Sequence, residues 1–225
     1  EPPLQPLLPV PLSDLHQLLD HVVPELVLHH QQKRRLGAVI IEHNIYNLLL
    51  SLPYYHSVTS NCTGFFSAVE EMTLPSGRLQ KISNENIFID FAHTPDALEA
   101  VCSELKKKNH KGLKLVFGAG GDRDQGKREL MGNVAQKYAK KVYITSDNPR
   151  FEKPEEIIEM IATGISDKDK VIIEPDRAEA ISMAISELNK DEILLITGKG
   201  HEEYQIIGNE KKPFSDYEEI LKCIK

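Results

Sequence analysis

From residue 86 onward, short apolar runs alternate with longer amphipathic stretches, and this alternation limits the possible folds more than any other feature. The runs are continuous and rich in Val, Ile and Leu: NIFIDF, LKLVFG, KKVYIT, KVIIEP and EILLIT. Strands of a parallel sheet show this pattern, because crossover helices cover both faces of such a sheet. The sequence therefore predicts an α/β fold, a Rossmann-like domain of three layers with a mostly parallel sheet.

The stretches between and after these runs complete the expected domain. Helices are expected over TPDALEAVCSELKKK, KRELMGNVAQKYA, KPEEIIEMIATGI and DRAEAISMAISELNK. The segment YQIIGNEKKPFSD has Gly208 and Asn209 at its expected turn and could add an edge strand to the sheet. A last short helix, SDYEEILKCIK, is expected to be capped by Ser215.

The N-terminal third lacks this regularity. Residues 1–40 are rich in Pro and Leu without a clear period, and they stay unassigned. Residues 41–85 contain NIYNLLLSL, which is apolar at helical spacing, followed by turns and the strand-like RLQKI. We therefore expect an unassigned segment (1–40), a helical remnant with a linker (41–85) and the regular domain (86–225). A helical, irregular segment would then precede the α/β domain.

Charge and composition exclude several classes of partner. The formal net charge of -7 disfavours general binding to nucleic acid or to an anionic membrane. There is no run of about 20 apolar residues and no signal-peptide pattern. Cysteines are scattered, without metal-ligand spacing, and no histidine pair has the spacing of a metal site. We therefore expect no bound metal, no membrane contact and a reducing, cytoplasmic location.

Four unusual segments follow four of the predicted strands. They are DFAHTPDA (90–97), GAGGDRDQGKR (118–128), SDNPR (146–150) and GKGHEEY (198–204). Ligands of open α/β sheets bind beyond the carboxyl ends of the strands, and all four segments fall on that edge. Each alone could be an ordinary loop, but the four together indicate a binding site.

The residues in these segments suit a ligand that carries both charges. The glycine-rich segment fails the dinucleotide pattern because Arg123 stands at the third glycine position, and it fails the phosphate-loop pattern because Arg128 replaces Ser or Thr. Its charges fit either an anion site or a self-paired surface cluster. The Asp-Asn-Pro-Arg segment 147–150 offers an acceptor, a donor and a guanidinium, as an α-amino acid requires. An Asx turn at a strand end is the alternative.

In order and spacing, these motifs resemble the C-terminal domain of Mur ligases, over about residues 75–225. The match is strongest to the branch that adds meso-diaminopimelate to UDP-N-acetylmuramoyl-alanyl-glutamate, an amide-bond ligase of peptidoglycan synthesis. The segment SGRLQ resembles the family's PGR linker. The resemblance implies ATP and Mg²⁺ as cofactors of the full-length enzyme, with an acyl phosphate that the diaminopimelate amine attacks.

The resemblance also implies roles for individual residues. Diaminopimelate would be held by the residues at the matching positions: Arg123, Asp147, Asn148, Arg150, Gly198 and Glu202. Arg150 would pair with the distal carboxylate, which lysine lacks, and this would explain discrimination against lysine. Arg78 and Asp90 match positions near the nucleotide. His93 matches a position that faces the cleft and is the catalytic candidate.

The sequence departs from the family in one respect that bears on activity. The family's GTNGKT-type phosphate loop, its magnesium ligands and its modified lysine do not occur among the 225 residues. We therefore expect no ligase activity and no tight ATP or Mg²⁺ binding from this chain alone. The resemblance adds the missing ATP-binding domain to the candidate partners. The alternative function is a truncated, non-catalytic ligand-binding module or remnant. A different Rossmann-like transferase is disfavoured by the failed dinucleotide pattern.

Overall fold

The computed structural model describes residues 76–82, 86–108 and 111–224. All of them belong to one of the two units into which the chain divides, Leu74–Lys225. The expectations for residues 1–40 and for the helices and turns of residues 41–75 lie outside the described residues. The division at residues 40 and 85 therefore stays a prediction.

Strands and helices alternate along the described chain, as the apolar pattern predicts. The strands are β1 (Gln80–Ile82), β2 (Ile87–Asp90), β3 (Leu113–Phe117), β4 (Lys141–Ile144), β5 (Val171–Ile173), β6 (Ile193–Thr197), β7 (Tyr204–Ile207) and β8 (Glu210–Pro213). The helices are α4 (Pro95–Lys108), α5 (Gly126–Tyr138), α6 (Pro154–Thr163), α7 (Arg177–Ser186) and α8 (Asp216–Cys223), with a 3-10 turn, η1 (Lys168–Lys170).

One six-stranded sheet forms the centre of the described part, in the order β1-β2-β6-β3-β4-β5. β2, β6, β3, β4 and β5 run parallel, and β1 pairs antiparallel with β2 at one edge. Every residue of β2, β3 and β6 is buried, which explains why their sequences are continuously apolar. The predicted α/β fold with a mostly parallel sheet is confirmed.

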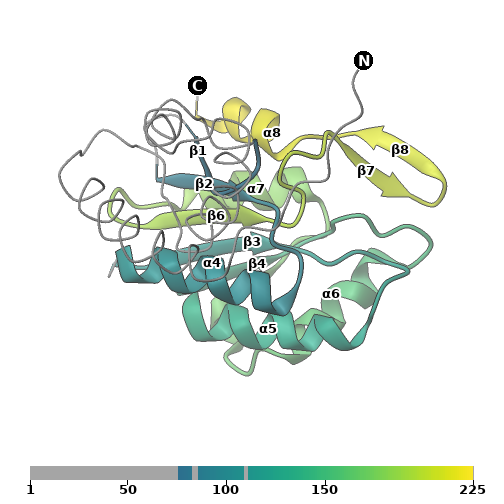
Figure 1. The fold of residues 1–225 in the computed structure, drawn as a ribbon, viewed down its shortest axis with the longest axis horizontal. Helices are drawn as coiled ribbons and strands as arrows, with labels where there is room; N and C mark the ends of the chain where they lie inside the picture. Colours follow the sequence, from purple (N-terminus) through teal and green to yellow (C-terminus); the bar gives the residue numbers. More distant parts are fainter. Residues whose placement is uncertain (1–75, 83–85, 109–110, 225) are drawn as a thin grey trace, which may run out of the picture. The chain divides into compact units, whose positions relative to one another are not determined.

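Helices cover both faces of this sheet. The crossovers from β2 to β3, from β3 to β4 and from β4 to β5 all step in one direction, so right-handed connections place α4, α5 and α6 on one face. The crossover from β5 back to β6 steps in the other direction, which places α7 on the opposite face, where it packs against α8. Figure 1 shows these two groups of helices on either side of the strands.

The helix N-termini differ in how they are capped. α7 is capped by Asp176, whose side chain accepts hydrogen bonds from the amides of Ala178 and Glu179. α4 begins with Pro95, and Thr94 Oγ1 accepts from Ala97 N at 3.3 Å. Ser215 occupies the N-cap position of α8, as expected, but its side chain makes no capping hydrogen bond. The prediction that Ser215 caps this helix with its side chain is therefore wrong.

The C-terminal hairpin does not extend the main sheet. β7 and β8 form a separate two-stranded sheet, with Gly208 and Asn209 at the turn between Ile207 and Glu210 as predicted. The expected edge strand is therefore wrong. β7 is instead held by a parallel bridge between Ile207 and Arg150 in the loop after β4. This holds the hairpin against the loops at the carboxyl end of the strands (Figure 1).

None of the helices within the described ranges has the length and apolar character that a membrane span requires.

Candidate functional site

A cavity of about 370 Å³ lies at the carboxyl edge of the sheet, between the loops that follow β2, β3, β4 and β6. The residues assigned to the ligand from sequence all line it: Arg123, Asp147, Asn148, Arg150, Gly198 and Glu202. His93 lines it as well. A larger hollow of about 560 Å³ next to Gly200 and α8 contains none of these residues. The smaller cavity is therefore the candidate site, because the side chains with ligand-binding chemistry converge there.

Asp147 is the most unusual group in the cavity. It is only 7% exposed, no hydrogen bond to its carboxylate is found among the described residues, and its oxygens are not fully enclosed because the side chain lines the cavity. A largely buried carboxylate that meets a cavity without a protein donor can accept hydrogen bonds from a cationic ligand group. Gly198 makes room for it: this residue has φ +112°, and a Cβ there would lie 2.6 Å from Asp147 Oδ2.

Asn148 and Glu202 are connected through a lysine that the sequence interpretation did not assign to the site. Lys199 is fully buried, and its Nζ lies 3.1 Å from Asn148 Oδ1 and 3.2 Å from Glu202 Oε2. Asn148 Nδ2 donates to the same Glu202 oxygen at 3.0 Å. A lysine between two glycines after a buried strand, three residues before a glutamate, is the sequence signal that could have found it.

Arg150 is fixed by its backbone and by one of its guanidinium nitrogens. Its φ of +52° is left-handed, and its amide and carbonyl form hydrogen bonds with Ile206 O at 3.0 Å and Gly208 N at 2.7 Å. Nη1 donates to Gly121 O at 2.7 Å. Nε and Nη2 donate to no described residue, so this edge of the guanidinium is available to a carboxylate.

The charged glycine-rich loop contains both a paired and an available arginine. Arg128 is buried and donates to Glu152 from both terminal nitrogens, at 2.7 and 2.8 Å. These bonds lower the pKa of Glu152 to about 2. Arg123 is exposed at the cavity, with one bond to Asp122 O at 3.2 Å. The self-paired alternative therefore describes Arg128, whereas Arg123 remains free to meet an anion.

Residues assigned to the nucleotide lie outside this cavity. The Arg78 guanidinium stacks over the Phe91 ring at 4.7 Å from its centroid. Asp90 accepts from Leu79 N and Ala92 N, each at 2.7 Å, and burial raises the pKa of its carboxyl group against these bonds. Asp90 thus holds the strained Leu79, whose φ is +43°. A nucleotide contact for Arg78 and Asp90 stays a prediction.

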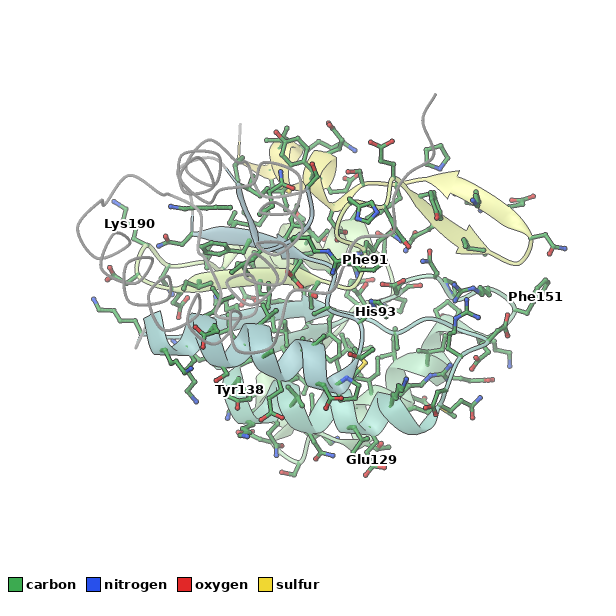
Figure 2. All side chains as sticks on the ribbon, in the orientation of Figure 1. Phe91, His93, Glu129, Tyr138, Phe151 and Lys190 are labelled. Atoms are coloured by element: carbon green, nitrogen blue, oxygen red, sulfur yellow. The ribbon has the colours of Figure 1, made fainter. Side chains whose placement is uncertain are left out.

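His93 is one of the residues that line the cavity. Figure 2 shows it beside Phe91, with the two ring centroids 4.8 Å apart. Its Nδ1 is 2.8 Å from Phe91 O, which requires a proton on Nδ1 because a carbonyl oxygen only accepts. In the neutral ring Nε2 is then the atom with a lone pair. The geometry makes His93 a possible proton acceptor, and its catalytic role stays a prediction.

A buried ion pair supports the strand ends beneath the site. Arg177 of α7 pairs with Asp216 of α8 at 2.7 and 2.8 Å, and both side chains are fully buried. Arg177 also donates to Thr197 O at 3.0 Å, and Thr197 Oγ1 donates to Ala92 O at 2.7 Å. These bonds fix the ends of β2 and β6 relative to each other.

The site therefore combines two kinds of group. Asp147 and one oxygen of Glu202 can accept from an ammonium, and Arg123 and Arg150 can donate to a carboxylate. Such a set suits an amino acid with separated charges. The described residues contain no group of three or more His, Cys, Asp or Glu that could hold a metal ion.

Comparison with protein families gives a match over residues 77–200 to the family described as Mur ligase, glutamate ligase domain. A UDP-N-acetylmuramoyl-L-alanyl-D-glutamate--2,6-diaminopimelate ligase of Rickettsia rickettsii is 46% identical over 181 residues, which is 80% of this chain and 38% of that protein. The enzyme of the same name from Helicobacter hepaticus is 45% identical over 181 residues, with the same coverage of both chains. The chain thus spans 38% of the length of these relatives.

Solved structures give the same result. A UDP-N-acetylmuramoyl-L-alanyl-D-glutamate--2,6-diaminopimelate ligase has a TM-score of 0.63 at 37% identity, covering 81% of this chain and 38% of that one. A Mycobacterium tuberculosis folylpolyglutamate synthase has a TM-score of 0.57 at 22% identity over 70% of this chain and 37% of its own. The second likeness shows a shared fold.

Proposed function

The chain belongs to the Mur ligase family and carries its C-terminal domain, and from this premise we propose that it is the amino-acid-binding part of an ATP-dependent meso-diaminopimelate ligase. The acceptor in that reaction is UDP-N-acetylmuramoyl-L-alanyl-D-glutamate, as in the names of its relatives. The family supports amide-bond formation as the reaction class. The substrate, ATP dependence and mechanism are our proposal.

The observation that carries the proposal is the nearly buried Asp147 carboxylate, which shares one cavity with the available edge of Arg150. Diaminopimelate has an ammonium and a carboxylate at each end, so it can satisfy both. The ammonium groups of L-lysine can bind the carboxylates of Asp147 and Glu202, but L-lysine has no second carboxylate of its own to bind Arg150. A guanidinium left without its partner disfavours lysine, and this is how Arg150 would select the substrate.

In the proposed reaction, the amine of diaminopimelate attacks the carbonyl carbon of a glutamyl acyl phosphate. The C–N bond forms, the bond from carbon to the phosphate oxygen breaks, and phosphate leaves while the amine loses a proton. Asp147 and Glu202 orient the amino acid, and Nε2 of His93 takes the proton. ATP and Mg²⁺ supply the phosphoryl chemistry in the full-length enzyme.

We also propose that this chain alone turns over no substrate, because none of its 225 residues forms a GTNGKT-type phosphate loop. ATP hydrolysis that depends on diaminopimelate, measured with the purified chain, would overturn this. The second candidate function is a binding module without catalytic activity. It is supported by the same cavity with Asp147 and Arg150, since none of the residues lining that cavity belongs to a phosphate loop. We place either function in the cytoplasm, where the nucleotide-linked precursor is made.

Calorimetric titration tests the proposal. The chain should bind meso-diaminopimelate more tightly than L-lysine, and Arg150→Ala should remove this preference by weakening diaminopimelate about tenfold or more. Arg128→Ala is unsuitable as a control because it removes a buried ion pair. Lys190→Met is the matched control, since Lys190 precedes β6 at the opposite end of the sheet. Equal affinity for both amino acids would contradict the assignment.

A further inference from the structure

We propose that Lys199 is a positioning residue that sets the orientation of Asn148 and Glu202 and thereby limits the site to one ligand ammonium. This inference rests on the proposed amino-acid binding. Lys199 is fully buried and lies behind the cavity, whose lining includes Asn148 and Glu202 but not Lys199. It therefore acts on a ligand through these two side chains.

The Asn148 amide is held in one orientation by this lysine. Asn148 Oδ1 accepts from Lys199 Nζ at 3.1 Å and from the amide of Ile206 at 2.9 Å. Both groups only donate, so the oxygen must face them and Nδ2 must face Glu202. The fixed amide then offers the ligand no competing acceptor, because Oδ1 is already used twice.

Glu202 is divided by the same contacts into a used and an available oxygen. Oε2 accepts from Lys199 Nζ at 3.2 Å and from Asn148 Nδ2 at 3.0 Å. Oε1 accepts from no described residue, and the side chain is 21% exposed. Lys199 thus turns Oε1 toward the accessible side, where an ammonium can reach it.

The charges of the cluster fit a single ammonium. Asp147 and Glu202 contribute two negative charges, and Lys199 contributes one positive charge. Two other buried cations nearby are already paired, Arg177 with Asp216 and Arg128 with Glu152, each at 2.7 Å. Arg123 and Arg150, which also line the cavity, are left for the carboxylates of the ligand. Among Asp147, Glu202 and Lys199, one negative charge then remains for a ligand ammonium. Without Lys199 two carboxylates would repel each other across the cavity, and both their geometry and the charge balance would change.

The first test compares diaminopimelate binding to the chain with Lys199→Met, Lys199→Gln and the control Lys190→Met. Lys199→Met should weaken binding about tenfold or more, whereas Lys190→Met should leave it unchanged. Lys199→Gln keeps a donor without the charge and serves if the apolar variant does not fold. In the Glu202→Gln background the Lys199→Met loss should shrink, because the lysine acts through Glu202. Independent, multiplying losses would indicate a merely structural lysine.

The second test needs no ligand and separates this inference from the proposed function. The Asn148 side-chain amide signal of the labelled chain is assigned by its absence in Asn148→Asp and is then followed in both lysine variants. Lys199→Met should shift it and speed its solvent exchange, whereas Lys190→Met should not. An unchanged signal overturns the positioning role whether or not diaminopimelate binds. If the wild-type chain binds no diaminopimelate but Lys199→Met still shifts the Asn148 signal, only the proposed function is contradicted.

Discussion

Two lysines are buried at opposite ends of the same sheet, and the carboxylates beside them are used to different extents. Lys114 in β3 lies 3.4 Å from Glu192, and the two side chains are 5% and 4% exposed. Both Glu192 oxygens are used, because Lys140 and Asn189 donate to them as well. Lys199 lies 3.2 Å from Glu202, whose second oxygen has no described donor.

This difference distinguishes a stabilising cluster from a binding cluster. Hydrogen bonds satisfy the ions at the amino end, so that cluster needs nothing further and contributes to folding. The cluster at the carboxyl end leaves Asp147 and part of Glu202 without a described donor at the cavity, and we propose that a ligand cation binds them. Mutations at the two ends should therefore separate stability from binding.

The largest effect is expected from Glu192→Ala. It leaves the Lys114 ammonium in the protein interior without its carboxylate, and loss of one partner of a buried pair costs about 3–5 kcal/mol. Urea unfolding should show this loss, while the diaminopimelate affinity of the folded chain should not change. A loss below about 1 kcal/mol would mean that the Glu187 carbonyl, which also accepts from Lys114, is sufficient.

The second largest effect is expected from acid, which should weaken the cluster of Lys114, Glu192 and Lys140 at the amino end of the sheet. Burial opposes the charge of Glu192, but hydrogen bonds from Lys140 and Asn189 outweigh it and lower its pKa from 4.5 to about 2. The folded pKa is below the unfolded one, so the stabilisation is present above pH 4.5 and is lost as the pH falls toward 2. Its upper limit is about 3 kcal/mol. Urea unfolding at pH 6 and pH 3 should show a smaller decrease for Glu192→Gln than for the wild type.

At the carboxyl end, Asp147→Asn should affect binding instead of stability. The amide is neutral, so diaminopimelate loses a charge-assisted contact worth about 1.5–3 kcal/mol, or roughly 10- to 150-fold in affinity. Removing a nearly buried charge that has no described donor should leave the unfolding free energy unchanged or higher. Calorimetry and urea unfolding on one preparation check both parts. If Asp147→Asn lowered the unfolding free energy but left the affinity unchanged, Asp147 would contribute to stability and not to binding.

The smallest effects come from two glycines with positive φ. Gly198→Ala places a Cβ 2.6 Å from Asp147 Oδ2, whereas Gly208→Ala at the hairpin turn meets nothing within 4 Å. Both should lose about 1–2 kcal/mol of stability through backbone strain. Only Gly198→Ala should also weaken diaminopimelate binding, because it displaces the carboxylate. Equal affinities of the two variants would show that Asp147 can move without affecting the ligand.

The fold, and the meeting of the four unusual loops at one edge of the sheet, follow from the sequence for a physical reason. Strands buried on both faces must be continuously apolar, and parallel strands bring their carboxyl ends to one edge. The four unusual loops therefore had to meet there, and the six residues assigned to the ligand do line one cavity. Their individual roles still await measurement.

The missed features depend on partners that are distant in the sequence. Both Arg128 and Arg123 line the cavity, and nothing local shows that Arg128 pairs with Glu152 whereas Arg123 has no carboxylate partner among the described residues. Lys199 resembles a solvated loop lysine until Asn148 is placed beside it. The hairpin β7–β8 forms its own sheet and is bridged through Ile207 to Arg150, a partner more than 50 residues away in the sequence. Such pairings arise only when the loops after β3, β4 and β6 have been brought together.

The order of the strands has a consequence for how the chain folds during synthesis. β2 and β3 are consecutive parallel strands, yet β6 lies between them. β6 is the last of the parallel strands to leave the ribosome, and until then β2 and β3 each keep an unpaired row of backbone groups. Pairing such as Ile87 with Leu194 joins distant parts of the chain, which slows folding. Lys199 and Glu202 lie in the loop directly after β6, so the strand that completes the sheet also brings these two residues to the other loops of the candidate site.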